Sequence, residues 1–403
     1  MRDLVKVLLA VLVLLLQASQ GLPAEKKGTW SIDDFEDGDL KAAPGLSWFL
    51  IADDLTGGAS QARLDVRPGG PEGSKHALRL SGRLDGSRGW PFAGAWANLD
   101  RMGRSVNLDA FEGIRLRVKG PARLQVGLRA GGNNFMAEVD AGSGWKLVDV
   151  PFSSLVAQGK AAEGTRWSSE AVQVFGITTP QATRGTEHAP AKVDFEVDDV
   201  VLYGGGPAPR PVPSGTTGPI STIPFTSLAS IPSSGWVELA TDPERDGKMP
   251  MLPDATRLET IPASADGILW LRVSLRERPH DRWLGMNLAF DTDGDPADGR
   301  PWWGANKEFK FDQIVTIWCF HVAEGCEGYI GLADSGQAAA GDYTSQGGGE
   351  FRVAIDPQRR AYIVGIPRTS LHLEKEEFRL VAAVGSALLF ADDVPGEGAV
   401  VLH

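Results

Sequence analysis

The sequence predicts an all-β protein made of two β-sandwich domains joined by a Pro/Gly-rich linker. Three observations predict this. Short segments in both halves place an apolar residue at every second position, which buries one face of a strand. The 403 residues include 49 Gly and 26 Pro spread through the chain, which indicates many turns. A Pro/Gly-rich stretch at 204–219 has no apolar pattern, so we expect a spacer that cannot pair as a strand.

The N-terminal segment has the features of an export signal. A basic start is followed by an uncharged apolar run over residues 7–16. Ser19 and Gly21 are small residues at the two positions that a signal peptidase inspects, so residues 1–21 are predicted to be a cleaved signal peptide. The alternative is an uncleaved anchor, although the apolar run is shorter than the ~20 residues of a membrane span. We therefore expect a secreted, periplasmic or cell-surface protein that leaves the membrane after cleavage.

Residues 28–203 are expected to form the first sandwich. Alternating segments at 114–118, 124–129 and 135–139 are separated by Gly- and Pro-containing turns. If these strands are neighbours, one sheet face carries planar polar groups suited to sugar hydroxyls, and the alternative is a solvated face with cross-strand ion pairs. This expected face consists of Arg115, Arg117, Gln125, Arg129, Glu138 and Asp140.

The first domain resembles the complex I intermediate-associated protein 30 family and the related family 11 carbohydrate-binding modules. The resemblance covers roughly residues 30–203 and follows five motifs in order: 34–38 (DFEDG), 53–60 (DDLTGGAS), 111–120 (FEGIRLRVKG), 150–155 (VPFSSL) and 195–200 (FEVDDV). Both families imply a jelly roll of galactose-binding type. They imply different functions, namely assembly of a mitochondrial complex or glucan binding outside the cell, and the export signal favours the second.

Residues 220–403 are expected to form the second sandwich, of immunoglobulin-like or jelly-roll type. Apolar alternation marks strands at 269–275, 284–290, 313–322, 351–355 and 361–366. This domain loosely resembles the family 9 carbohydrate-binding modules in the stretches 266–273 (DGILWLRV) and 287–295 (NLAFDTDGD).

The acidic turn at 291–299 is the most specific local motif. Asp291, Asp293 and Asp295 offer oxygen ligands at alternate positions, and oxygen is the ligand that Ca²⁺ prefers. The alternative is a solvated acidic turn. By resemblance, Glu36 and Asp199 are candidates for a second structural Ca²⁺ that joins the two ends of the first domain, with solvated strand ends as the alternative.

Twelve Trp in an exported β protein favour sugar platforms, because a flat ring stacks on the apolar face of a pyranose. The candidate ligand-binding rings are Trp90, Trp96, Trp270, Trp302 and Trp303. Core packing is the alternative for each of them. Trp270 is expected to be exposed, because it shares its strand face with polar residues.

The two cysteines, Cys319 and Cys326, are predicted to form a disulfide across a hairpin, with two free buried thiols as the alternative. The net charge of −12 argues against nucleic-acid or anionic-membrane partners. No nucleophile elbow, metalloprotease or phosphate-loop motif occurs. The sequence therefore favours a non-catalytic carbohydrate-binding or accessory protein with a polysaccharide partner. A chaperone-like or scaffolding protein that binds another exported polypeptide, or a glycan-active enzyme with an unrecognised carboxylate pair, are the alternatives.

Overall fold

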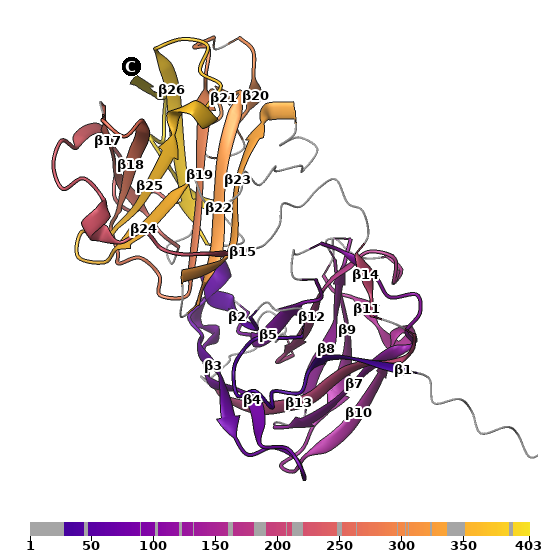
Figure 1. Ribbon diagram of the computed structural model, residues 1–403. Coiled ribbons are helices and arrows are strands. Elements are labelled where there is room, and N and C mark those ends of the chain that lie inside the picture. The colour runs from indigo at the N-terminus through magenta and orange to yellow at the C-terminus, as the bar shows by residue number, and fades with distance from the viewer. Residues whose placement is uncertain are drawn as a thin grey trace, which may run out of the picture.

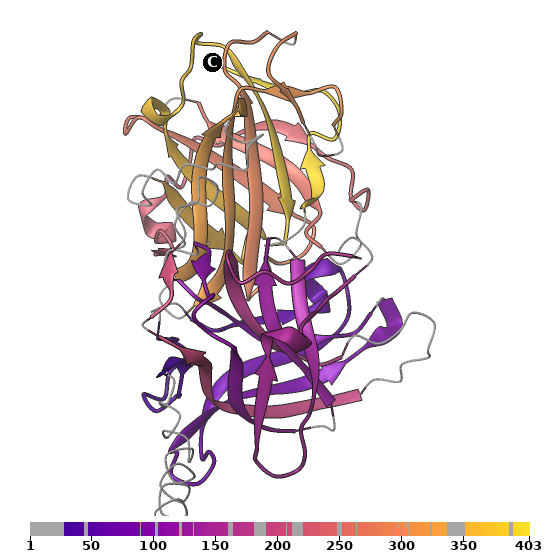
Figure 2. The same ribbon diagram turned by 90° about the vertical axis from the view of Figure 1, so that its right-hand side faces the viewer.

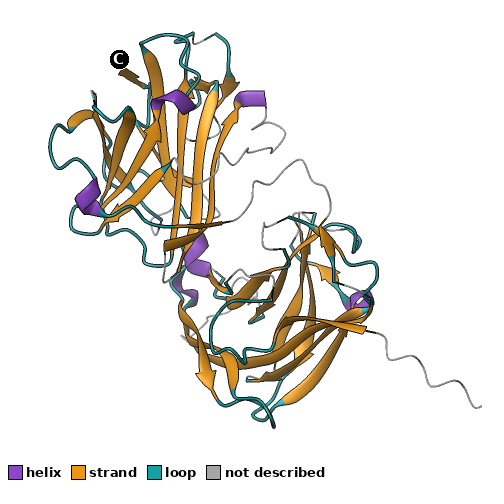
Figure 3. Ribbon diagram, viewed as in Figure 1, coloured by secondary structure: helices purple, strands orange, loops and turns teal. Residues whose placement is uncertain are grey.

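The chain folds into two antiparallel β-sandwiches, as the computed structural model shows (Figures 1 and 3). The structure describes residues 28–43, 47–88, 90–100, 104–120, 123–131, 133–159, 164–180, 191–206, 208–211, 221–247, 252–262, 264–295, 297–302, 304, 306–322, 325–336, 351–386 and 390–403. The expected signal peptide lies outside these residues. No helix in this described part of the chain is long and apolar enough to span a membrane.

The first sandwich packs a six-stranded sheet on an eight-stranded sheet around one apolar core. The first sheet has the order β10 (Lys146–Pro151), β7 (Gly113–Lys119), β13 (Ala191–Gly205), β4 (His76–Leu84) and β3 (Gln61–Pro68), with β1 (Gly28–Asp33) also paired to β13. The second sheet has the order β11 (Val156–Ala157), β9 (Asn133–Asp140), β8 (Arg123–Ala130), β12 (Val172–Thr178), β5 (Ala93–Asn98) and β2 (Phe49–Ala52), with β6 (Val106–Asn107) beside β12.

The second sandwich packs a seven-stranded sheet on a five-stranded sheet. The third sheet has the order β15 (Ser221–Ile223), β23 (Gly325–Asp334), β22 (Gln313–Val322), β19 (Trp283–Asp291), β26 (Phe378–Gly385) and β27 (Phe390–Val394), with β28 (Val400–Leu402) also paired to β26. The fourth sheet has the order β16 (Val237–Thr241), β17 (Ala255–Ile261), β18 (Ile268–Leu275), β25 (Ala361–Pro367) and β24 (Arg352–Asp356). β20 (Arg300–Pro301) and β21 (Lys310–Phe311) form a separate small ribbon.

Part of the expected spacer is paired, so the expectation that it cannot form a strand is wrong. Gly204 and Gly205 belong to β13, and β14 (Arg210–Pro211) pairs with β6 of the second sheet. The pairing is possible because β14 lies at the end of its sheet path, where the missing N–H of Pro211 breaks no inner ladder.

An apolar cluster joins the two sandwiches where the ends of β22 and β23 approach β2 (Figures 1 and 2). Ile51 and Leu55 of the first domain pack with residues of the second domain, and Phe49 stacks on Phe320 with ring centroids 4.6 Å apart. The second domain contributes Leu252, Trp283, Phe320 and Ala391. We call these residues the domain junction.

Polar contacts surround the domain junction. The Glu327 carboxylate accepts hydrogen bonds from the backbone N–H of Ser47 at 2.7 Å and from its hydroxyl at 2.8 Å. Arg282 pairs with Asp54, which lies in the 3-10 helix η1 (Asp53–Thr56). The hydroxyl of Ser386 donates to the carbonyl of Leu55 at 2.8 Å. Apolar packing and polar contacts therefore both hold the two domains together.

Cleavage of the spacer should leave the two domains associated. Limited proteolysis is expected to cut within 204–219, outside the paired residues. Because the domain junction is buried, the two fragments should elute together from a size-exclusion column and separate only in denaturant. Separate elution under native conditions would contradict a stable junction, and a cut mainly inside either sandwich would contradict the domain boundaries.

Candidate functional site

The outer face of the second sheet carries an apolar row that crosses its strands. The strand register aligns Phe49 with Trp96, Trp96 with Gly176, Gly176 with Gly127, and Gly127 with Met136. Val156 of β11 continues the row beyond Met136. The residues between them on these strands point inward and build the core, among them Ala95, Ala97, Val126, Leu128 and Phe135. We call Phe49, Trp96, Gly176, Gly127, Met136 and Val156 the apolar row.

Two glycines let larger side chains lie flat on this sheet. A Cβ at Gly176 would come within 2.7 Å of Trp96 Nε1, and a Cβ at Gly127 would come within 2.9 Å of the Met136 sulfur. Both distances are shorter than any ordinary carbon contact, so the Trp96 indole and the Met136 thioether lie over the bare backbone. Glycine in a strand interior often marks such a close approach.

Polar side chains flank the apolar row on both sides. On one side the register aligns Thr178, Gln125 and Glu138. On the other side it aligns Val174, Arg129 and Asn134, with Asn98 next to Val174. Hydroxyl, amide, carboxylate and guanidinium groups therefore flank the apolar row, in which Gly127, Gly176 and Met136 are buried.

Arg129 differs from the paired arginines of the first domain. Arg79, Arg115 and Arg117 each pair with a carboxylate, at 2.7, 2.6 and 2.9 Å. Arg129 has no such pair among the described residues, and its buried Nε has no hydrogen-bond partner there. Its guanidinium lies 6.0 Å from the centre of the Trp96 ring, and burial lowers its pKa below the ordinary value. A partly buried arginine without a described carboxylate partner, beside an aromatic ring, is a candidate ligand-binding group.

Two further buried polar atoms on this face lack a partner within the described part of the chain, Trp96 Nε1 and Asn134 Oδ1. Trp96 and Asn134 belong to neighbouring rows of the same face. Together with Arg129 they leave two donors and one acceptor beside the apolar row without a described partner.

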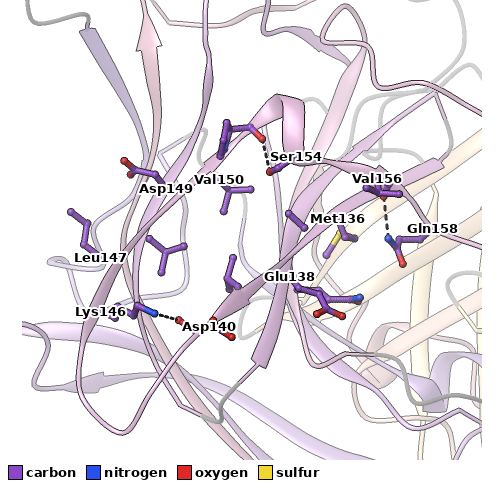
Figure 4. A pocket seen from close by; sticks show the side chains of 15 residues that line it. Met136, Glu138, Asp140, Lys146, Leu147, Asp149, Val150, Ser154, Val156 and Gln158 are labelled. Atoms are coloured by element: carbon purple, nitrogen blue, oxygen red, sulfur yellow. Dashed lines mark hydrogen bonds between the residues drawn. The ribbon is translucent and has the colours of Figure 1, made fainter.

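A cavity of about 700 Å³ lies at the far end of the face, where the edge strands of the two sheets meet (Figure 4). Gln125, Met136 and Glu138 of the second sheet line one side of it, and Leu147 of β10 lines the other. Leu147 and Val156 are among the exposed large apolar side chains. The apolar row therefore runs from the domain junction at Phe49 to this cavity.

The predicted polar face is only partly correct. Gln125, Arg129 and Glu138 share the outer face of the second sheet. Arg115 and Arg117 lie on β7 in the first sheet, because β7 and β8 are consecutive strands that belong to opposite sheets. The carboxylate that pairs with Arg117 is Asp199. Arg117 is therefore removed from the candidate site.

The predicted aromatic platforms differ in burial. Trp90 is 52% exposed and Trp96 is partly buried on the candidate face. The expectation that Trp270 is exposed is wrong, since Trp270 is 0% exposed. Ile231 and Trp236, which lie outside its strand, pack against it. Trp302 is also no platform: it is 2% exposed, and its Nε1 donates to Asp393 at 2.7 Å. Trp303 lies outside the described residues.

The acidic turn brings together a different set of carboxylates from the predicted one. Asp291, Asp293 and Asp312 offer oxygens within 4.8 Å of one another. Asp295 is exposed and lies outside this group, and its carboxylate accepts the Ala297 N–H. Asp312 directly precedes β22, and β22 pairs with β19, the strand that ends at the acidic turn. This pairing brings Asp312 next to Asp291 and Asp293. A local sequence motif could not reveal it, because Asp312 lies far from them in the sequence.

The predicted pair at the ends of the first domain is also changed. Glu36 accepts hydrogen bonds from Ser74 and Lys75. A bulge in β13, with Asp199 at φ 49°, turns Asp199 outward and leaves Asp198 fully buried. Burial is the main cause that raises the pKa of Asp198 to about 6, and the charge of Glu36 contributes. The buried neighbour of Glu36 is therefore Asp198.

The predicted disulfide is confirmed. Cys319 of β22 and Cys326 of β23 are bonded, with Cα atoms 5.5 Å apart. The hairpin is also confirmed, because the two strands pair from Gln313–Asp334 to Val322–Gly325.

Comparisons with known proteins concern mainly the first domain. The family model described as complex I intermediate-associated protein 30 matches residues 35–192, so the resemblance expected for this domain is confirmed. No curated protein matches the chain. The expected resemblance of the second domain to family 9 modules stays a prediction.

Three similar solved structures are carbohydrate-binding modules. The family 11 module of the cellulosomal cellulase Lic26A-Cel5E of Clostridium thermocellum is 14% identical, with a TM-score of 0.34, over 45% of this chain and 97% of that chain. The family 11 module from Clostridium thermocellum in complex with a β-1,3-1,4-mixed-linked tetrasaccharide is 14% identical, with a TM-score of 0.34, over 45% and 98%. A family 30 module is 9% identical, with a TM-score of 0.27, over 41% and 92%.

Proposed function

We propose that this chain is an exported, non-catalytic protein that binds a polysaccharide along the apolar row of the second sheet. The observation that carries the proposal is the arrangement of Trp96 and Met136 over two glycines, between two rows of planar polar groups. Sugars need this combination, because a pyranose has apolar C–H faces and a rim of hydroxyls.

The unpartnered atoms define the expected contacts. A pyranose on the Trp96 ring brings its hydroxyls next to Arg129 and Asn134, whose buried polar atoms have no other described partner. A buried polar atom without a partner costs roughly 1–3 kcal/mol, and a hydroxyl that satisfies it recovers part of this. Gln125 and Glu138 lie on the opposite side of the apolar row and can bind further hydroxyls.

Single substitutions on this face should weaken binding. Glycan-array screening of the mature chain would identify the polysaccharide, and calorimetry would give its affinity. Trp96→Ala should weaken binding about 10- to 100-fold, because it removes the stacking ring and its N–H. Arg129→Gln should weaken binding about 10-fold or more, because it removes a charged donor.

Arg115→Gln is the matched control, since Arg115 lies on the first sheet and pairs with Asp149. Its affinity should equal that of the wild type. Equal binding by wild type, Trp96→Ala and Arg129→Gln would reject the apolar row as the binding site. An array without any bound glycan would reject the function.

A second candidate function is binding of another exported polypeptide, in a chaperone-like or scaffolding role. The exposed apolar side chains of Leu147 and Val156 beside the cavity favour it, since apolar surface suits protein partners. Binding of a polypeptide that survives saturating glycan and is weakened by Leu147→Ser would support this function.

Export also belongs to this proposal. The Cys319–Cys326 disulfide supports it, because disulfides persist in oxidising compartments. The mature protein should begin at Leu22 when it is isolated from the exported fraction and sequenced.

The proposal further includes structural Ca²⁺. At the acidic turn, Asp293 and Asp312 offer oxygens, while Asp291 already pairs with Arg379. In the first domain, the unpartnered Oδ2 of buried Asp198 beside Glu36 fits a cation better than Asp199 does. Removal of calcium by a chelator should lower the melting temperature of the wild type by more than it lowers that of Asp293→Ala, because the variant has already lost the acidic-turn ion.

A further inference from the structure

A second acidic cluster lies at one end of the second sandwich, away from the acidic turn. Asp242, Asp246 and Asp392 offer carboxylate oxygens within 4.8 Å of one another. Asp242 directly follows β16, Asp246 lies in the loop between β16 and β17, and Asp392 belongs to β27. The cluster therefore connects the fourth sheet to the third sheet.

Two buried carboxylates at this place are only half satisfied. Asp242 is 8% exposed; one of its oxygens accepts the Gly396 N–H at 2.9 Å, and the other has no partner among the described residues. Asp254 is 3% exposed; its Oδ2 accepts from Arg276 Nε at 2.6 Å and from the Arg245 N–H at 2.8 Å, and its Oδ1 has no described partner. Charged oxygens buried in this way require a cation or a donor.

The unpartnered oxygen of Asp254 faces the cluster. A Cβ at Gly247 would lie 3.4 Å from Asp254 Oδ1 and 3.5 Å from the carboxyl carbon of Asp392. Both carboxylates thus border the same small space, beside the bare Cα of Gly247. The other carboxylate of this segment, Asp393, points away and binds Trp302 Nε1 and the Asn306 N–H.

Without a cation this arrangement is electrostatically unfavourable. The carboxylates of Asp242, Asp246, Asp254 and Asp392 border one small space, and like charges at such distances repel one another. The four carboxylates offer only oxygen ligands, which select a hard divalent cation over a soft one.

We propose that Asp242, Asp246 and Asp392, with the unpartnered oxygen of Asp254, bind a divalent cation of the calcium class. The ion joins the loop between β16 and β17 to β27, and so links the two sheets of the second sandwich. Leu252 of this loop and Ala391 beside Asp392 both belong to the domain junction. The ion therefore also fixes two of the residues on which the first domain rests.

Calcium alone is the probe for this site. The full mature chain is dialysed against 1 mM CaCl₂ and its bound calcium is measured, with all variants made in an Asp293→Asn background so that the acidic turn does not contribute. Asp392→Asn should lower the bound calcium by one ion per chain, and Asp246→Asn, at an exposed position, should weaken binding about 10-fold or more. Asp281→Asn, which changes a carboxylate with 92% side-chain exposure, should change nothing.

Thermal melting gives a second readout with opposite signs. In chelator, Asp392→Asn should melt at or above the temperature of its background, since the amide oxygen still accepts the Ala255 N–H and one carboxyl fewer crowds the cluster. In calcium, the background should gain stability and Asp392→Asn should gain less. Equal calcium content in Asp392→Asn and its background, or no response of either melting curve to calcium, would overturn the proposal.

Discussion

Replacing Arg282 by alanine should destabilise the protein by about 3 kcal/mol. Arg282 and Asp54 come from different domains, and their side chains retain only 25% and 15% exposure. The substitution leaves the Asp54 carboxylate largely buried, with the His280 ring 3.3 Å away. Because burial lowers the pKa of His280, that ring is a poor replacement at neutral pH. Truncating one partner of a buried ion pair typically costs 3–5 kcal/mol.

The same substitution should separate the unfolding of the two domains. Urea unfolding of the wild type should show one transition, since the domain junction couples the sandwiches, and Arg282→Ala should show two. Arg257→Ala is the matched control, because Arg257 pairs with Glu238 at 3.2 Å on the surface, where both side chains are about half exposed. Its effect should stay below about 1 kcal/mol. Equal effects of the two substitutions would show that the Arg282 pair does not hold the domains together.

Asp33 should make the first domain less stable as the pH rises. Its carboxyl is buried, accepts the Phe35 N–H at 2.8 Å and accepts Trp48 Nε1 at 2.7 Å. Burial is the main cause that raises its pKa from 3.8 to about 7 in the folded protein. A carboxyl with a raised folded-state pKa is protonated on folding, so its unfavourable contribution grows from about pH 4 and is complete above about pH 7. Three pKa units correspond to at most about 4 kcal/mol.

Asp33→Asn removes this titration. The amide keeps one acceptor for the Phe35 N–H but turns an N–H₂ group toward Trp48, so the variant should be less stable than the wild type at pH 5 by about 1–2 kcal/mol. Between pH 5 and pH 8 the wild type should lose about 2–4 kcal/mol of stability relative to the variant, so the difference between them should shrink or reverse. Urea unfolding at both pH values measures this change, and Asp39→Asn at an exposed position nearby is the control. A wild-type-to-variant difference that is the same at both pH values would exclude Asp33 as the source.

The alternation of apolar and polar residues predicted where strands occur, but not which sheet each strand joins. The segments at 114–118 and 269–275 are strands β7 and β18, because local burial of alternate residues sets their period. That β7 and β8 enter opposite sheets depends on long-range packing, so Arg117 and Gln125 were wrongly placed on one face. Trp270 was misjudged for a similar reason, since Ile231 and Trp236 cover its polar-looking face from outside the strand.

The candidate site was only partly visible in the sequence. Arg129 and Trp96 could be named individually, but their approach to within 6.0 Å follows from the register of β5, β12 and β8. Gly127 and Gly176 carry no motif of their own. They become informative only when the register places them side by side under Trp96 and Met136.

The position of the disulfide has a consequence for how the domains recognise each other. Phe320 and Glu327 are direct cross-strand partners, and they contact Phe49 and Ser47 of the first domain. Cys319 and Cys326, the residues before them in sequence, are bonded in the core behind this pair. The bond prevents the hairpin strands from separating, so an aromatic ring and a carboxylate are presented at a fixed spacing before the domains meet. The hairpin thus loses much of its conformational entropy when the disulfide forms, before the two domains dock. Docking then costs less entropy, because the surface that the hairpin presents is already ordered.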